Sequence, residues 1–302
     1  MKQIIRSTTF LAIIAALLWS TAFAGIKIGL QYQSPLQFAA LRFFLAGLMV
    51  ALAFARWKFL VKETLREWRF ILTIAVIQVI VQYGLFYTGM NLVPGALGAM
   101  IVGSSPLFVA LVAHFIHPND KLTPVKSISI LTGVAGIAII TAGRQQIELK
   151  NPHEWLGIIL LIFNNLASGY SNVLVSKSAR PLSPIILTSS SLMIGGAMLY
   201  SIALPIEGPD TGPFPWPYYL SLIWLAFLSA SAFSIWYSLL RRPGVMVSRL
   251  NVWKFLIPVS GAALSWILVE GEHPDFTSLA GMLVIVAALL LNSLRPRRKE
   301  HP

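Results

Sequence analysis

The chain has 302 residues, of which 56% are hydrophobic and only 11% are charged, and its formal net charge is +12. Soluble domains carry about 25% charged residues, so this chain has too few to cover a soluble particle of its size. The absence of cysteine excludes disulfides, thiol catalysis and thiolate metal sites.

Apolar segments of about 20 residues, the length that crosses a bilayer, recur along the whole chain. Pro, Gly, Asn and charged residues separate them, as is typical of inter-helix loops. The pattern predicts an all-α membrane protein with ten transmembrane helices. The expected spans are 10–30, 36–55, 70–90, 95–117, 123–143, 155–176, 184–204, 218–240, 245–269 and 275–294.

The Lys and Arg residues predict the orientation. Of the 23, 17 lie at the termini or in one alternate set of loops, whereas only Arg144 and Lys150 lie in the other set. Basic loops stay in the cytoplasm, so we expect cytoplasmic N- and C-termini and an even number of spans. The basic residues form no single patch, which argues against nucleic acid as a partner.

Weak sequence matches at a nearly constant offset indicate a duplication. We expect a first five-helix repeat in residues 1–150 and a second in 151–302. Because five spans is an odd number, the second repeat would be inverted in the membrane, and such carriers bind substrate near mid-membrane where the repeats meet. The matched pairs are Ser34-Pro35 with Ser183-Pro184, Gly47 with Gly196, Phe86-Tyr87 with Trp236-Tyr237, and Pro106 with Pro258.

Several motifs resemble one known family along the whole chain. They are Leu18-Trp19-Ser20 in the first span, Ser34-Pro35 and Leu41-Arg42-Phe43 in the second, Ala96 through Pro106 in the fourth, and Asn251-Val252-Trp253-Lys254-Phe255-Leu256-Ile257-Pro258 followed by Glu270 in the ninth. On these motifs the chain resembles the EamA family of the drug/metabolite transporter superfamily. The resemblance implies a basket of two inverted five-helix repeats, with a cavity lined by spans 1, 3, 4, 6, 8 and 9. Similar members export amino acids and related metabolites from bacteria, and distant relatives carry nucleotide sugars or sugar phosphates.

The sixth span carries a polar stripe at helical spacing, formed by Asn164, Ser168 and Asn172 with Asn165 and Ser171 beside it. Positions four residues apart share one helix face. At the corresponding place the first span has Trp19, Phe23 and Lys27, so Asn164 stands where a counterpart of Trp19 is expected. An aromatic wall facing a polar stripe suits an amphipathic solute. Helix–helix hydrogen bonding is the alternative for the stripe, and it is favoured for Ser171.

Lys254 lies near the middle of the ninth span, on one face with Asn251, Pro258 and Gly261. A central Lys costs roughly 2.5–3.5 kcal/mol on insertion scales, so it normally faces water, a partner or a substrate. Binding of a substrate carboxylate and a structural role both remain open. Pro258 and its counterpart Pro106 are expected to break their helices, and paired broken helices point to a binding site.

Further candidate pocket walls lie on the third and eighth spans. They are Gln78, Gln82 and Tyr83 on the third span and Trp236 on the eighth. Packing of buried aromatic residues with satisfied polar groups is the alternative. Arg42 in the second span is interpreted as structural.

These features favour an alternating-access exporter of amino acids or related amphipathic metabolites in the bacterial inner membrane. We expect a small-molecule substrate, the lipid bilayer, no cofactor and a monomer or weak dimer. One alternative is a carrier of organic anions such as sugar phosphates or nucleotide sugars. The other is a membrane enzyme or receptor, against which the sequence offers no catalytic motif.

Overall fold

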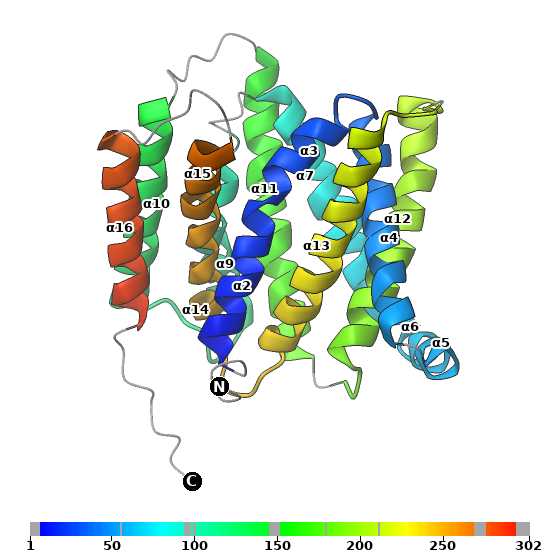
Figure 1. Ribbon diagram of the computed structural model, residues 1–302. Helices are drawn as coiled ribbons and strands as arrows, with labels where there is room; N and C mark the ends of the chain where they lie inside the picture. Colours follow the sequence, from blue (N-terminus) through cyan, green and yellow to red (C-terminus); the bar gives the residue numbers. More distant parts are fainter. Residues whose placement is uncertain are drawn as a thin grey trace.

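All regular elements in the described part of the chain are helices. The computed structural model describes residues 7–54, 56–93, 98, 101–144, 152–178, 180–210, 212–268 and 276–293 (Figure 1). The helices are α2 (Thr8–Ser20), α3 (Ala22–Gly29), α4 (Pro35–Phe54), α5 (Trp57–Arg66), α6 (Trp68–Ile74), the π-helix η1 (Ala75–Tyr83), α7 (Gly84–Leu92), α9 (Ser105–Ile116), α10 (Pro124–Arg144), α11 (Pro152–Lys177), α12 (Pro184–Glu207), α13 (Trp216–Leu240), α14 (Val247–Asn251), the 3₁₀ helix η2 (Val252–Phe255), α15 (Leu256–Leu268) and α16 (Phe276–Ser293).

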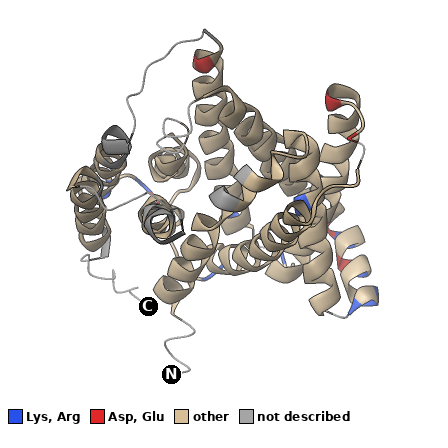
Figure 2. Cartoon of the chain, turned by 45° about the horizontal axis from the view of Figure 1, so that its top comes forward, with Lys and Arg blue, Asp and Glu red and all other residues tan. Residues whose placement is uncertain are grey.

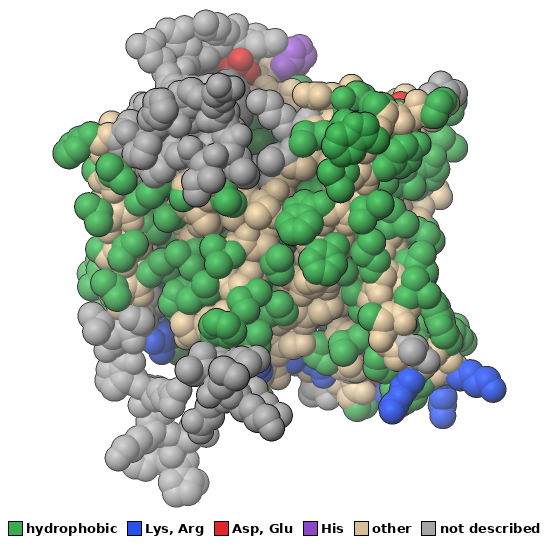
Figure 3. Space-filling view, in the orientation of Figure 1, with side chains coloured by type: hydrophobic (Ala, Val, Ile, Leu, Met, Phe, Trp, Pro, Cys, Tyr) green, Lys and Arg blue, Asp and Glu red, His purple; other side chains and the backbone are tan. Residues whose placement is uncertain are grey.

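The surface is that of a membrane protein. Five described segments are long and apolar enough to cross a bilayer, namely Pro35–Phe54, Trp68–Leu92, His153–Lys177, Pro184–Glu207 and Trp216–Leu240. Hydrophobic side chains cover the middle of the molecule, and Lys and Arg gather along one end (Figure 3). The acidic residues at the opposite end stand out when the molecule is tilted (Figure 2). The prediction of an all-helical membrane protein is therefore confirmed for the described residues, and the count of ten crossing helices stays a prediction.

The described helix limits agree with the hydropathy pattern. Nine expected spans coincide with helical segments to within three residues at each end. In the fourth, 95–117, α9 covers Ser105–Ile116 and residues 98 and 101–103 are also helical, whereas 94–97 and 99–100 lie outside the described residues. The amphipathic helix α5 lies in a stretch that the sequence assigned to a loop, because its apolar row is too short for a span.

Close helix pairs rely on glycine. An added Cβ on Gly47 of α4 would stand 2.5 Å from the Ser189 carbonyl oxygen of α12, and one on Gly196 of α12 would stand 2.5 Å from the Phe44 nitrogen. At the opposite edge of the molecule α10 packs along α16. There a Cβ on Gly136 would stand 2.8 Å from the Gly281 carbonyl oxygen. Small residues let membrane helices approach closely where hydrophobic driving force is weak.

Candidate functional site

Two helical segments begin beside a proline near the middle of the molecule. Pro106 is the second residue of α9 and Pro258 is the third residue of α15. A proline in the first turn of a helix removes an N–H that has no intrahelical acceptor, so α9 can begin beside Pro106 without loss. The 3₁₀ segment η2 joins α14 to α15 without a break, and α9 packs against both α14 and η2. The fourth and ninth spans therefore lie side by side.

Lys254 of η2 lies beside a pair of indole rings that contact each other. Its Nζ is 5.1 Å from the ring centroid of Trp236 on α13 and 5.6 Å from that of Trp19 on α2. Both distances suit cation–π attraction. Within the described residues no carboxylate reaches ion-pair distance of this ammonium. The indole N–H groups of Trp19 and Trp236 are themselves buried and find no hydrogen-bond partner in the described part of the chain.

The same face of the ninth span borders open space. An added Cβ on Gly261 would meet no atom within 4 Å. The described side chains of α15 are all half-buried rather than packed. Among the described residues, the space next to Gly261 is therefore open, whereas Lys254 lies against Trp19 and Trp236.

Aromatic rings connect this site to the second and third spans. Trp19 contacts Trp236 at a centroid distance of 5.1 Å and Phe233 at 5.8 Å. Phe233 lies 6.2 Å from Tyr83, which stacks on Phe43 at 4.3 Å. Edge-to-face and tilted pairs at these separations stabilise one another beyond their buried area. The result is an aromatic wall between η1, α4, α13 and α2.

The polar stripe of α11 bonds largely to other helices. Gln78 donates to Gln82 (2.7 Å) and accepts a hydrogen bond from the Ser171 hydroxyl (2.6 Å). Asn165 donates to the Ile101 carbonyl oxygen at 2.6 Å. The Asn164 amide lies 3.1 Å from the Gln82 carbonyl oxygen. These bonds join α11 to η1 and to the turn before α9.

The structure separates the predicted residues into two groups. Trp19, Trp236 and Lys254 come together, whereas Asn172 donates to Asn251 (3.0 Å), which in turn donates to the Val247 carbonyl oxygen. Ser168 is also buried. The side chains of Phe23 and Lys27 lie outside the described residues.

Buried Arg42 was named in the sequence only as structural, and the structure shows its partners. It is 2% exposed. Its Nε donates to the Ser229 hydroxyl (2.9 Å) and its Nη1 donates to the Tyr87 hydroxyl (3.2 Å). The guanidinium also lies 5.1 Å from the Phe43 ring centroid. A cation thus lies behind the aromatic wall, on the side opposite Lys254.

Two helix caps join residues far apart in the sequence, and neither was predicted. In the α14 cap (Asp120, Lys126 and Ser248), the fully buried Asp120 carboxylate accepts from the Ser248 N–H at 2.7 Å, from the Ser248 hydroxyl and from Lys126 Nζ at 2.6 Å. In the α4 cap (Ser34, Glu207 and Asp210), Glu207 accepts from the N–H groups of Leu36 and Gln37, and Asp210 accepts from Ser34. Carboxylates at helix N-termini stabilise both the unpaired N–H groups and the helix dipole.

No group of three His, Asp or Glu side chains that could hold a metal ion occurs among the residues the structure describes. Among these residues, the central site offers the Lys254 ammonium, aromatic faces and amide groups.

Comparisons with known proteins identify the family. The profile of the "EamA-like transporter family" matches residues 6–142 and 155–294. The uncharacterized transporter YvbV of Bacillus subtilis is 25% identical over 99% of this chain and 96% of its own. A probable amino-acid metabolite efflux pump of Salmonella typhimurium is 25% identical over 95% of each chain, and its Escherichia coli namesake is 23% identical.

One solved crystal structure overlays on 98% of this chain and 99% of its own with a TM-score of 0.78. Its sequence identity is 20%, so this likeness concerns the fold alone. The family match covers most of the chain in two segments, and the matched relatives carry the names of transporters rather than enzymes. The chain belongs to the EamA-like transporter family and is a multi-pass membrane transporter.

Proposed function

We propose that the protein exports amino acids or related small amphipathic metabolites by alternating access, and that Lys254 receives the substrate carboxylate. The observation that carries this proposal is the Lys254 ammonium, held 5.1 Å and 5.6 Å from two indole rings with no ion-pair partner among the described residues. A carboxylate would offer this ammonium a charge-assisted hydrogen bond, which is stronger than a cation–π contact.

Helix geometry adds positive potential at the same depth. Helix α9 begins at Ser105, beside Pro106, whereas α15 continues from η2 without a break. The N-terminus of a helix carries about half a positive charge, and in transporters with discontinuous helices such N-termini commonly point at anionic substrate groups. Lys254 and the start of α9 together favour an anionic group on the substrate.

The aromatic wall favours an apolar body on the substrate. Trp19, Phe233 and Tyr83 present rings to one another at 5.8 Å and 6.2 Å. Pockets of this kind bind solutes by apolar contact and orient them with a few polar groups. Gln78, Gln82, Asn164, Ser168, Asn172 and Asn251 supply amide and hydroxyl groups for the rest of the polar head.

We also propose the architecture that this mechanism needs, namely ten membrane-crossing helices in two inverted repeats, 1–150 and 151–302. The helix contacts support the two-repeat architecture. If each span of the first half is replaced by the corresponding span of the second half, and the reverse, nearly the same set of helix pairs is obtained. Thus α4 pairs with α12 and α10 with α16, while the contact of α13 with α4 matches that of α12 with η1. The two segments matched by the family profile also support it.

The proposed location is the bacterial inner membrane with both termini in the cytoplasm. Helix α2 begins and α16 ends at the end of the molecule where basic side chains gather (Figures 1 and 3). Because the chain has no cysteine, single cysteines can report sidedness without removing native ones. With Lys62→Cys at the basic end and Pro209→Cys at the other, an impermeant maleimide should label only Pro209→Cys in intact cells.

The substrate class is supported by the efflux-pump names of relatives and is tested by transport in reconstituted vesicles. Uptake and counterflow are measured for a panel of amino acids and of phosphorylated sugars. We expect amino acids with apolar side chains to move and to compete with one another. Movement of phosphorylated sugars without movement or competition by amino acids would instead support the organic-anion alternative.

Lys254→Gln tests the role of the ammonium in the same assay. It should lower kcat/KM for amino acids at least tenfold, whereas Lys62→Gln on the exposed face of α5 should have no effect. Elution as a monodisperse peak verifies that each variant is folded. If Lys254→Gln leaves both affinity and rate unchanged, Lys254 does not bind the substrate.

A further inference from the structure

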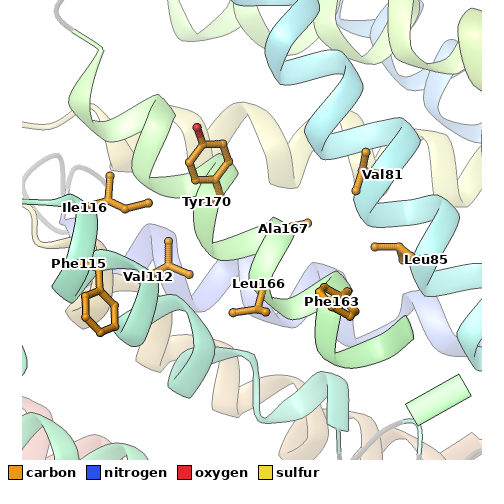
Figure 4. Close-up of a pocket in the computed structure, with 9 residues that line it drawn as sticks. All are labelled: Val81, Leu85, Val112, Phe115, Ile116, Phe163, Leu166, Ala167 and Tyr170. Carbon is orange, nitrogen blue, oxygen red and sulfur yellow. The ribbon is translucent and has the colours of Figure 1, made fainter. Parts of the chain in front are cut away.

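A groove on the outer surface lies apart from the central site. Its volume is about 590 Å³, and its lining comes from three spans. Val81 and Leu85 line it from η1 and α7, Val112 and Phe115 from α9, and Phe163 and Tyr170 from α11 (Figure 4). Phe115 is 74% exposed and Phe163 is 55% exposed. The groove is therefore an apolar surface within the membrane-facing part of the molecule.

One face of α11 continues from this groove to a basic pocket. Phe163, Tyr170, Leu174 and Lys177 follow one another at spacings of seven, four and three, which places them along one helix face. A second pocket of about 530 Å³ is lined by Phe70, Leu174, Lys177, Ser178 and Arg180. Leu174 thus belongs to the same helix face as the apolar groove and to the wall of the basic pocket.

The basic pocket can hold an anion. Lys177 Nζ donates to the Ile116 carbonyl oxygen at 3.1 Å and Arg180 Nη1 donates to Glu67 at 2.7 Å. An ammonium has three N–H donors and a guanidinium has five, so these bonds use only part of their capacity. Arg241 donates to the Arg180 carbonyl oxygen and Arg66 to that of Pro181. These four cations outnumber the two carboxylates beside them: Arg66 pairs with Glu63 and Glu67, and Arg180 pairs with Glu67.

The dimensions fit one lipid leaflet. Phe163 and Lys177 are 14 positions apart, which is about 21 Å along a helix. One leaflet counted with its headgroup region is about 20–22 Å thick, half of the roughly 40–45 Å of a whole bilayer. A headgroup phosphate at Lys177 and Arg180 would therefore place its acyl chains over Leu174, Tyr170 and Phe163.

We propose that this groove binds an anionic phospholipid, with its phosphate between Lys177 and Arg180 and one acyl chain in the apolar groove between η1, α9 and α11. Basic pockets between membrane helices are known places for anionic headgroups. A soluble solute does not fit, because the groove offers it scarcely any polar partner. A second copy of the chain would bury the apolar groove but would leave the basic pocket without a counter-charge.

The experiment is native mass spectrometry of the purified full-length protein with phosphatidylglycerol or phosphatidylcholine added at equal concentrations. We expect one phosphatidylglycerol to remain bound at collision energies that remove phosphatidylcholine. Lys177→Gln with Arg180→Gln should lower the bound fraction at least fivefold. Lys58→Gln with Lys62→Gln, on the exposed face of α5, removes the same charge outside the groove and should leave it unchanged.

Ala167→Trp tests the apolar part, because Ala167 lines the groove. It should lower binding of phosphatidylglycerol without changing the monodisperse elution or the thermal midpoint. An equal loss of lipid in both charge variants would indicate general attraction to the basic end and overturn the proposal. A dimer in the parent protein that Ala167→Trp converts to a monomer would assign the groove to subunit contact and overturn it as well.

Discussion

Trp19 and Trp236 both lie against the Lys254 ammonium inside the molecule, whereas the exposed Trp68 lies against Arg69 at its surface. Cation–π attraction is worth about 0.5–2 kcal/mol, and most where water is excluded. Trp19→Leu removes one ring face from Lys254 and one contact with Phe233. We expect this variant to raise the KM for the proposed amino-acid substrate about three- to tenfold in vesicle uptake, since the ammonium loses its fixed position.

The matched control for Trp19→Leu is Trp216→Leu, because the Trp216 indole is exposed at the start of α13. It should leave KM unchanged. An equal rise of KM in both variants would show that indole loss acts through the membrane interface and not through Lys254.

Asp120 and Lys126 form a buried ion pair, and breaking such a pair leaves an uncompensated charge. The carboxylate is fully buried and the ammonium nearly so. Removing one partner of a buried pair costs about 3–5 kcal/mol. We expect Asp120→Ala to lower the thermal midpoint in detergent by roughly 5–15 °C. Asp120→Leu with Lys126→Met, which removes both charges, should regain the part of this loss that comes from the unpaired ammonium, whereas the Ser248 N–H stays without its carboxylate acceptor.

The exposed pair of Arg180 and Glu67 provides the comparison for Asp120→Ala. Its N–O distance of 2.7 Å is similar, but exposed pairs contribute only about 0–1 kcal/mol. Glu67→Gln should therefore shift the midpoint by no more than 2–3 °C. If Glu67→Gln lowered the thermal midpoint more than Asp120→Ala does, burial of the ion pair would not determine how much stability is lost when the pair is broken.

The sequence identifies residues that are energetically unfavourable in a transmembrane helix whatever their neighbours are. A Lys in the middle of an apolar span and a proline in a helix both need a reason, so Lys254, Pro106 and Pro258 stand out without a structure. Asp120 lies in a loop and caps Ser248, 128 positions away. Nothing local distinguishes it from a solvated loop acid, because its burial arises only from the packing of two distant spans.

At the scale of helices, Gly47 and Gly196 allow α4 and α12 to touch backbone to backbone. An added Cβ would stand 2.5 Å from backbone atoms of the opposite helix at both positions. Backbone cannot move aside as a flexible side chain can, and overpacking costs typically 1–3 kcal/mol. Gly47→Ala and Gly196→Ala should each lower the thermal midpoint by several degrees.

Gly84→Ala is the matched control, since an added Cβ at Gly84 would meet no atom within 4 Å. Alanine favours helix by about 1 kcal/mol over glycine, so this variant should be neutral or more stable. A fall in the midpoint comparable with that of Gly47→Ala would contradict the assignment of helix contact as the cause.

Helix limits could be predicted from hydropathy because lipid fixes both the length and the composition of a span. Helix α5 could not be predicted in this way, because it does not cross the membrane. Trp57, Val61 and Leu65 form an exposed apolar row beside the basic row of Lys58, Lys62 and Arg66, while Leu60 and Glu63 are buried. The apolar, basic and buried faces of α5 average to a hydropathy close to that of a polar loop. Only the helical spacing of its apolar and basic residues could have predicted this helix from the sequence.

For the whole molecule, the two caps join the proposed halves at opposite ends. Asp120 of the first half caps α14 of the second, and Glu207 and Asp210 of the second half cap α4 of the first. Figure 1 places the start of α14 at one end of the molecule and the start of α4 at the other. Alternating access requires the halves to separate at one end at a time, so the two caps should oppose each other energetically.

This opposition predicts the direction in which each cap shifts the equilibrium. Gly261→Cys places a thiol on the face of the ninth span that also carries Lys254, where an added Cβ meets open space. Glu207→Gln with Asp210→Asn weakens the α4 cap and should increase labelling of that thiol by an impermeant maleimide from the acidic end. Asp120→Asn weakens the α14 cap and should decrease it. Labelling of Pro209→Cys, in the loop after α12, should not change, and a change of the same sign in both cap variants would contradict the coupling of the two caps.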